Sequence, residues 1–396
     1  MRALAALLAG AVGVALAPAL DAQSVTAGGT VDLRVGYGSN PFLSLNSQGG
    51  TGVAGGTLTA WLQRQSETST TRLTGIASID QNFSHYGRPE NYLATLRHDQ
   101  SFSARLRLQG ELNYQDSISA QTYNGFGSGT AVPGSLVGGD QTDLLSIGQR
   151  TRSVFGDASL QWQPTSRDSF YAGPSFNHTT YPGNGLSNFD QYGARGGYLR
   201  RINEKLQLGI DLNAQRVNSK FFPNSTSYQA SGRLVYDFSA IWQFDGSIGL
   251  INQRRAGIGS RTTAGFTARL CGKYPRYRAC IEAARQSSAS GLGGLRTDNR
   301  IDADISYDLT SLSQISAGAI YDISDSSETS VVPKQKYWQA SLTYRRTLSD
   351  RLSAGVTGNY QHRDYGALAA PVGLFGSTAS GYSVTANVSY RFGRLQ

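Results

Sequence analysis

The sequence has few of the residues on which enzymatic and metal-binding sites depend. Its 396 residues include two cysteines and four histidines. The histidines are dispersed, no carboxylate cluster stands at ligand spacing beside them, and no glycine-rich phosphate loop lies between a strand and a helix. We therefore expect that the protein is not an enzyme and that it holds no metal and no cofactor.

Two further absences concern membranes and nucleic acids. Beyond residue 22, no window approaches the run of about 20 apolar residues that a spanning helix needs. The net charge is +9, but lysine and arginine are scattered singly, with no run longer than pairs such as Arg254-Arg255. Nucleic acid is therefore not expected as a partner. The mature chain is expected to stay in the periplasm, to be secreted, or to cross a membrane as a barrel.

The N-terminus has the composition of a secretory signal peptide. Arg2 gives a short positive start, residues 3–17 are apolar and uncharged, and Leu20-Asp21-Ala22 offers a small-residue cleavage site. No cysteine stands near this site, so a lipoprotein anchor is not expected. We predict a signal peptide over residues 1–22 and one domain over residues 23–396.

The predicted domain alternates apolar and polar residues throughout its length. In the segment 104–115, the set containing Leu106, Leu108 and Leu112 lies on one face, while the intervening residues are charged or amides. A period of two is typical of β-strands, and a helix would mix the two sets. The same split recurs at 206–215, 242–250, 301–309, 338–344, 352–360 and 382–392.

The number and spacing of these segments favour a transmembrane antiparallel β-barrel. About eighteen strands can be counted, and sixteen is the alternative because 31–37 and 281–290 alternate poorly. Short turns such as 202–205 and 347–350 separate longer connections rich in glycine and serine, such as 117–149 and 363–380. Bacterial outer-membrane barrels have short periplasmic turns and long extracellular loops. A soluble sandwich is less favoured, since its core would need larger apolar side chains.

Five aromatic residues support the same interpretation. Trp162, Tyr236, Tyr307, Tyr344 and Tyr390 each stand just before a predicted short turn. Barrels place aromatic girdles at the membrane interfaces, although any one tyrosine could simply be a strand residue. We therefore predict that the protein lies in the bacterial outer membrane, with its lipids and the outer-membrane assembly machinery as partners.

Two segments resemble known outer-membrane proteins. The final strand, 381–392, resembles the C-terminal targeting strand of such proteins, with Tyr390 and Phe392 as its aromatic end. It differs in that four residues follow Phe392. The segment 35–43, Val-Gly-Tyr-Gly-Ser-Asn-Pro-Phe-Leu, resembles the opening of a β-barrel porin family whose members often accompany exopolysaccharide genes. The resemblance implies a pore or an export-associated barrel, with polysaccharide-export components as further candidate partners.

Strand parity assigns a set of charged residues to the barrel interior. They could brace the wall through cross-strand pairs, line a polar path for a solute, or do both. The predicted lumen-lining residues are Arg72, Arg97, Arg105, Arg107, Glu111, Asp157, Arg195, Asp211, Arg233, Asp245, Arg269, Asp302, Asp304 and Arg345.

The two cysteines, Cys271 and Cys280, bracket a short predicted periplasmic turn. In an oxidising compartment a disulfide is the first interpretation, and two free thiols are the alternative.

The function expected from these patterns is passage of polar solutes, or export of polysaccharide, through an outer-membrane pore. We expect the long segment 117–149 to fold inward and restrict the channel, with a surface loop as the alternative. A structural or surface-interaction barrel is the second functional class. An outer-membrane lipid hydrolase is the third, but no histidine has a serine two residues on, and His178 is followed at that spacing by Thr180.

Overall fold

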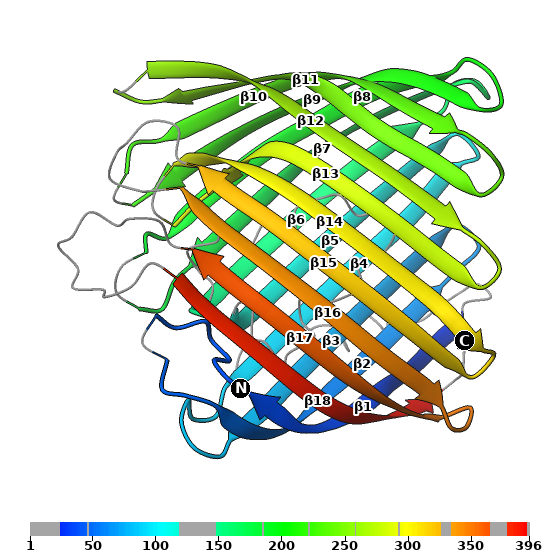
Figure 1. The fold of residues 1–396 in the computed structure, drawn as a ribbon. Helices are drawn as coiled ribbons and strands as arrows, with labels where there is room; N and C mark the ends of the chain where they lie inside the picture. Colours follow the sequence, from blue (N-terminus) through cyan, green and yellow to red (C-terminus); the bar gives the residue numbers. More distant parts are fainter. Residues whose placement is uncertain are drawn as a thin grey trace.

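The computed structural model describes residues 24–45, 47–118, 148–183, 186–220, 222–257, 259–291, 294–325, 334–364 and 378–393. These residues form one 18-stranded antiparallel sheet (Figure 1). The sheet closes on itself, because β1 pairs with β2 on one side and with β18 on the other. The predicted signal peptide, residues 1–22, lies outside the described residues.

The strands follow the chain in order around the barrel. Their bounds are β1 Ser24–Gly38, β2 Thr51–Gln65, β3 Ser69–Asn82, β4 Glu90–Ser103, β5 Leu106–Ile118, β6 Arg150–Trp162, β7 Asp168–Thr180, β8 Phe189–Arg201, β9 Leu206–Ser219, β10 Ser225–Asp237, β11 Trp242–Arg255, β12 Gly259–Lys273, β13 Tyr277–Ala289, β14 Leu295–Thr310, β15 Ser313–Asp325, β16 Gln335–Thr347, β17 Leu352–Asp364 and β18 Thr378–Gly393.

The closed barrel of eighteen strands confirms the predicted fold and decides against sixteen. The two weakly alternating segments are both strands, β1 and β13. Closure matters because backbone N–H and C=O groups in lipid have no water to bind, so each must find a partner on a neighbouring strand. Among the residues that the structure describes, no helix is long and apolar enough to cross a membrane.

The alternation in sequence becomes an alternation in exposure. Along β18, exposed and buried residues alternate almost perfectly, with Tyr382, Val384 and Val388 exposed and Ser383 and Thr385 buried. Mid-strand apolar residues elsewhere are among the most exposed side chains, and Ile248 is 72% and Leu33 63% exposed. A soluble protein would bury such residues, whereas a barrel turns them toward lipid.

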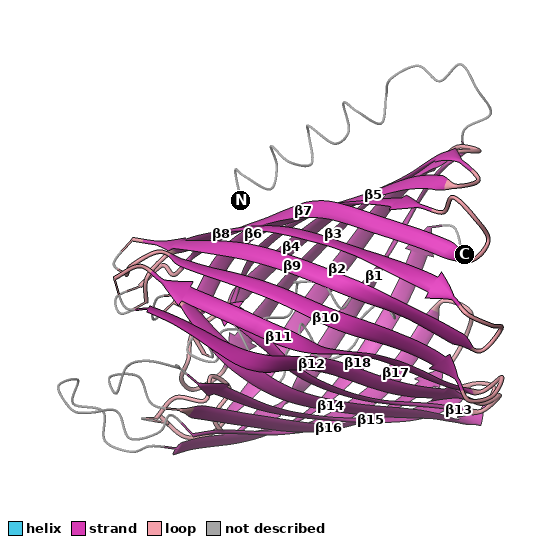
Figure 2. Ribbon diagram, turned by 90° about the horizontal axis from the view of Figure 1, so that it is seen from above, coloured by secondary structure: helices cyan, strands magenta, loops and turns pink. Residues whose placement is uncertain are grey.

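Connections of two kinds lie at the two ends of the barrel. At one end, tight turns such as 104–105 and 311–312 join each even-numbered strand from β2 to β16 to the strand that follows it. At the other end lie the longer connections, although 256–258 is as short as some turns. Strand β1 begins and strand β18 ends at the tight-turn end. Figure 2 shows the strands crossing obliquely between the two ends.

Exposed aromatic side chains form a girdle near each end of the outer surface. Near the tight turns these are Trp162, Phe170, Tyr307, Tyr344 and Tyr390, and near the longer connections they are Tyr37, Tyr192, Tyr228, Tyr321, Trp338, Tyr360 and Tyr382. Tyr382 and Tyr390 lie about 27 Å apart along β18 at about 3.4 Å per residue. With a tilt of about 40°, the apolar band between them is about 20 Å tall, close to that of outer-membrane barrels.

The even strand number, the tight turns at one end and the banded apolar surface together place this barrel in a bacterial outer membrane. By the same rule the tight turns face the periplasm and the longer connections face outward.

Candidate functional site in the barrel interior

Contacts between strands that are not neighbours identify the inner face. Arg195 on β8 pairs with Asp157 on β6 at 2.7 Å, and the hydroxyl of Tyr171 on β7 donates to Asp211 on β9 at 2.6 Å. Such contacts skip a strand, which side chains can do only on the concave side of a closed sheet. The charged residues on the same face of the sheet as these contacts therefore point into the barrel.

The inward charges form a continuous row that we call the charged belt. It consists of Asp157, Arg195, Asp211, Arg233, Asp245, Arg269, Glu282 and Asp302. Four of its members are direct cross-strand neighbours, since Asp245 pairs in register with Arg269, Arg269 with Glu282, and Glu282 with Asp302.

Ion pairs hold the side chains of the charged belt in place. The guanidinium of Arg233 donates to both carboxylate oxygens of Asp245, at 3.1 and 2.8 Å, and lies 3.9 Å from Asp211. Arg300 makes the same two-pronged contact with Asp302, at 2.6 and 3.0 Å. These side chains stay about a quarter to a third exposed, so they present paired charges to the interior.

Strand alternation in the structure puts nearly all the predicted lumen residues on this inner face. They are Arg72, Arg97, Arg107, Glu111, Asp157, Arg195, Asp211, Arg233, Asp245, Arg269, Asp302, Asp304 and Arg345. Several are paired with one another or with close neighbours. Arg97 and Arg107 both approach Asp99, for example, and the guanidinium of Arg72 lies over the ring of Trp61 at 5.2 Å.

One predicted residue is displaced from the wall. The sequence alternation runs unbroken from residue 104, but β5 begins at Leu106, and Arg105 lies in the two-residue turn after β4. Its carbonyl accepts a hydrogen bond from the backbone N–H of Gln163 at 2.8 Å. Arg105 is exposed at the periplasmic rim, because a tight turn must consume two residues that the pattern alone cannot distinguish from strand.

The sequence interpretation missed Glu282 and most of the polar residues at the outer mouth. Glu282 lies on β13, where alternation is poor, and its place follows only from its pairing with Arg269. At the mouth, Arg296 and Arg363 are almost fully buried, as are Gln335 and Gln361. Strand alternation gives these four residues the inward parity but does not predict their burial, which depends on how the mouth is packed.

The first inward segment is the connection after β1. Leu43 is fully buried and packs against Tyr337 of β16 and Ala379 of β18, on the inner face of the wall. The side chain of Asn40 holds the bend, since it exchanges hydrogen bonds with the backbone of Ser44 at 2.9 and 3.0 Å. Leu43 takes a positive φ of 50°, which fits a chain that turns sharply inward.

The second inward segment is the tip of β13 and β14, residues 286–291 and 294–298, which we call the inner hairpin. Ala289 and Leu295 pack against Phe189 and Val217 on the inner faces of β8 and β9. Ser287 accepts a hydrogen bond from the side chain of Gln253 on β11 at 2.8 Å. The hairpin thus leaves the wall and reaches strands four and five positions away.

These two segments narrow the outer mouth from different sides. The predicted restricting segment, 117–149, lies mostly outside the described residues, so its inward folding stays a prediction. Of its last residues, Gly148 lies against the carbonyl of Phe42 in the first inward segment, and its positive φ of 78° suits glycine.

Comparison with known proteins adds a likeness of fold. No protein-family model and no curated protein matches the sequence. Solved structures that resemble this chain include OccK2 of Pseudomonas aeruginosa in complex with glucuronate, at 12% identity over 94% of this chain and 99% of that chain, with a TM-score of 0.48. They also include a BenF-like porin from Pseudomonas fluorescens, at 8% identity over 94% and 99%, with a TM-score of 0.47. OprD of Pseudomonas aeruginosa has 10% identity over 94% and 96%, with a TM-score of 0.45. At these levels no residue role passes to this chain.

The structure brings together a histidine and a serine, His362 and Ser380, that lie on successive strands. His362 on β17 lies opposite Ser380 on β18, and its Nδ1 is 2.8 Å from the serine Oγ, on the outer face. A hydrolase would need a third group to orient the imidazole, and within the described part of the chain no carboxylate contacts it. His178 pairs instead with Asp190 at 2.5 Å, and no serine of the described residues hydrogen-bonds to it.

The two cysteines lie on the inner face beside the tight turn 274–276. Cys271 and Cys280 are in direct register across β12 and β13, and the structure joins them in a disulfide. Among the described residues, no group of three metal-ligating side chains gathers.

Proposed function

We propose that the protein is an outer-membrane pore for small polar solutes. The observation that carries the proposal is the charged belt, which turns paired arginine and carboxylate groups into the interior of a closed 18-stranded barrel. Barrels of this size leave an aqueous channel unless they are plugged. Burying a charge is costly, and the paired charges of the belt stay about a quarter to a third exposed, so the interior beside them can hold water.

The narrowed mouth favours small solutes over a polymer. Leu43 and the inner hairpin are fixed by packed apolar contacts, so their place in the opening is built into the fold. Export of a polysaccharide, which the sequence resemblance implies, would require both segments to move aside. We therefore place small-solute passage first and keep polysaccharide export, with its partner components, as the second form of the same proposal.

Conductance of the purified, folded barrel in planar bilayers tests the proposal. We expect discrete openings, and we expect Arg233→Gln to shift the reversal potential in a salt gradient toward cation preference, because it removes an inward positive charge. Arg346→Gln is the matched control, since Arg346 is exposed on the outer face near the tight turns.

A folded barrel that carries no current would contradict the pore and favour a surface-interaction barrel. Block of the current by long oligosaccharides but not by monosaccharides, together with passage of the long chains, would favour polysaccharide export.

A further inference from the structure

Two neighbouring strands of the wall, β12 and β13, separate before they reach the outer end of the barrel. The ladder between β12 and β13 begins beside the tight turn and ends at the pair Phe266–Arg285. Beyond it, β12 continues to pair with β11 as far as Gly259, and β13 continues to pair with β14 as far as Ala289. The two strands therefore remain in their own halves of the sheet while they part from each other.

The inner hairpin explains the separation. Because it crosses to β8 and β9, the tips of β13, β14 and β15 pass behind the tip of β12. Side chains on these tips whose strand parity would otherwise face lipid therefore face the inner side of β12. A cleft of about 340 Å³ lies between them, lined by Arg261, Arg285, Thr297, Asn299, Ile323, Asp325 and Lys334.

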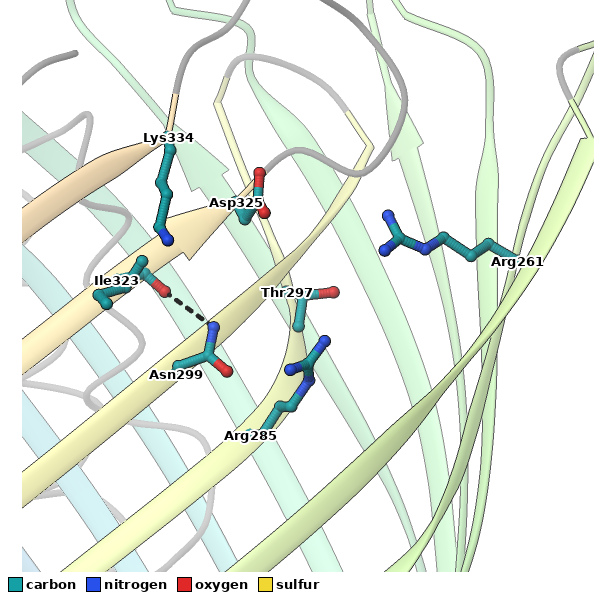
Figure 3. Close-up of a pocket in the computed structure, with 7 residues that line it drawn as sticks. All are labelled: Arg261, Arg285, Thr297, Asn299, Ile323, Asp325 and Lys334. Atoms are coloured by element: carbon teal, nitrogen blue, oxygen red, sulfur yellow. Dashed lines mark hydrogen bonds between the residues drawn. The ribbon is translucent and has the colours of Figure 1, made fainter.

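The cleft is cationic. Arg261 reaches across it from β12, Arg285 rises into it from β13, and Lys334 descends from the start of β16 (Figure 3). Asp325 is the one acidic side chain in the lining, so three positive groups face one negative group. Both Arg261 and Lys334 are exposed, so an anion can enter from the outer end of the barrel.

At the separation, the Nε of Arg285 and the Oγ1 of Thr263 on β12 are both buried, with no hydrogen-bond partner among the described residues. A buried donor without an acceptor is destabilising, and most such groups in native proteins are satisfied by a neighbour, water or an ion. A bound oxyanion would supply acceptors beside a guanidinium that already prefers them.

The position of the cleft relative to the outer aromatic girdle indicates which oxyanions can reach it. On β15, Ile323 and Asp325 lie just beyond Tyr321 of the outer aromatic girdle. On β12, Arg261 lies one residue beyond Thr262, which pairs with Asn252, the partner of Tyr228 in the same girdle. Aromatic girdles mark the membrane interface, so the cleft lies at the level of the outer-leaflet headgroups.

We propose that this cleft binds a phosphate group, held by Arg285 and Lys334 with Arg261 closing it from β12. A phosphate at this level can belong to a lipid headgroup or be free in solution. The chemistry of recognition is the same for both, because charge-assisted hydrogen bonds from guanidinium and ammonium groups reach the phosphate oxygens. The proposal depends on the membrane orientation of the barrel and not on transport.

Native mass spectrometry of the detergent-purified barrel tests the lipid source. The probes are a bis-phosphorylated glucosamine disaccharide lipid and the same lipid after phosphatase treatment. We expect the phosphorylated lipid to be retained preferentially by the wild type. Retention should fall about tenfold in Arg285→Gln and in Lys334→Gln, and Arg285→Lys should restore part of it. Arg346→Gln, which removes an equal charge at the opposite rim, should behave as wild type.

Calorimetric titration of the lipid-free barrel with inorganic pyrophosphate tests the soluble source. Binding that Arg285→Gln and Lys334→Gln abolish would support a site open to free phosphates, and lipid retention alone would support a headgroup site. If neither probe distinguishes these variants from Arg346→Gln, while all variants show the heat-modifiable migration of a folded barrel, the proposal is wrong.

Discussion

The middle of the barrel wall and its outer mouth follow different rules. In the middle, one parity faces lipid and the other faces the interior, as Ile248 and its neighbour Ser247 show. At the mouth the parity rule fails, because Ser287 has the lipid-facing parity of β13 and yet bonds to Gln253 inside the barrel. The difference teaches that alternation assigns a side chain to lipid only while its strand stays in the wall.

The largest expected effect comes from a charge in the middle of the wall. Ile248→Arg should impair folding into lipid by about 2–4 kcal/mol, since it places a charge at the lipid-facing midplane. Ser247→Arg, one residue away, should fold normally because its side chain points inward. Folding yields in lipid vesicles measure both, and equal yields would contradict the assigned faces.

The mouth should respond in its channel properties and not in its assembly. Leu295→Asp should release the inner hairpin from Val217 and Phe189, since the half-buried leucine loses part of the about 1.5–3 kcal/mol that full burial would give. A loss of about 1.4 kcal/mol raises the open population about tenfold, so single-channel conductance should increase. An unchanged conductance in a folded variant would mean that the hairpin does not limit the pore.

A smaller effect is expected at the tight-turn end, where the ladder is intact. Cys271→Ser with Cys280→Ser should lower stability by at most about 2–3 kcal/mol, because the disulfide closes a short loop between residues that already pair. Urea unfolding of the two forms gives the difference. Alkylation of two thiols in the unreduced wild-type protein would remove the predicted disulfide altogether.

The smallest expected effect is none. Ser380→Ala should leave phospholipid hydrolysis at background, since His362 beside it lacks an orienting carboxylate among the described residues. Release of fatty acid from vesicles is the measurement. Hydrolysis by the wild type that this substitution abolishes would restore the lipid-hydrolase alternative.

The sequence by itself determined that the wall is built of amphipathic strands and which side chains face inward along most of it, while the strand number stayed at eighteen or sixteen. It did so because alternation is a local property, and a lipid exterior with a polar interior repeats the same demand on every strand. Arg233, Asp245 and Arg269 could be assigned to the interior from parity alone. The assignment of Arg105 failed because a tight turn does not interrupt the alternation of the sequence.

The tertiary structure alone decided which inward charges meet and what happens at the mouth. The pairing of Arg195 with Asp157 skips a strand, so it depends on barrel curvature and register. The burial of Leu43, the crossing of the inner hairpin and the cationic cleft behind β12 all require chain segments far apart in sequence to pack together. No periodicity records such contacts, because their energy comes from surfaces that only the closed barrel brings face to face.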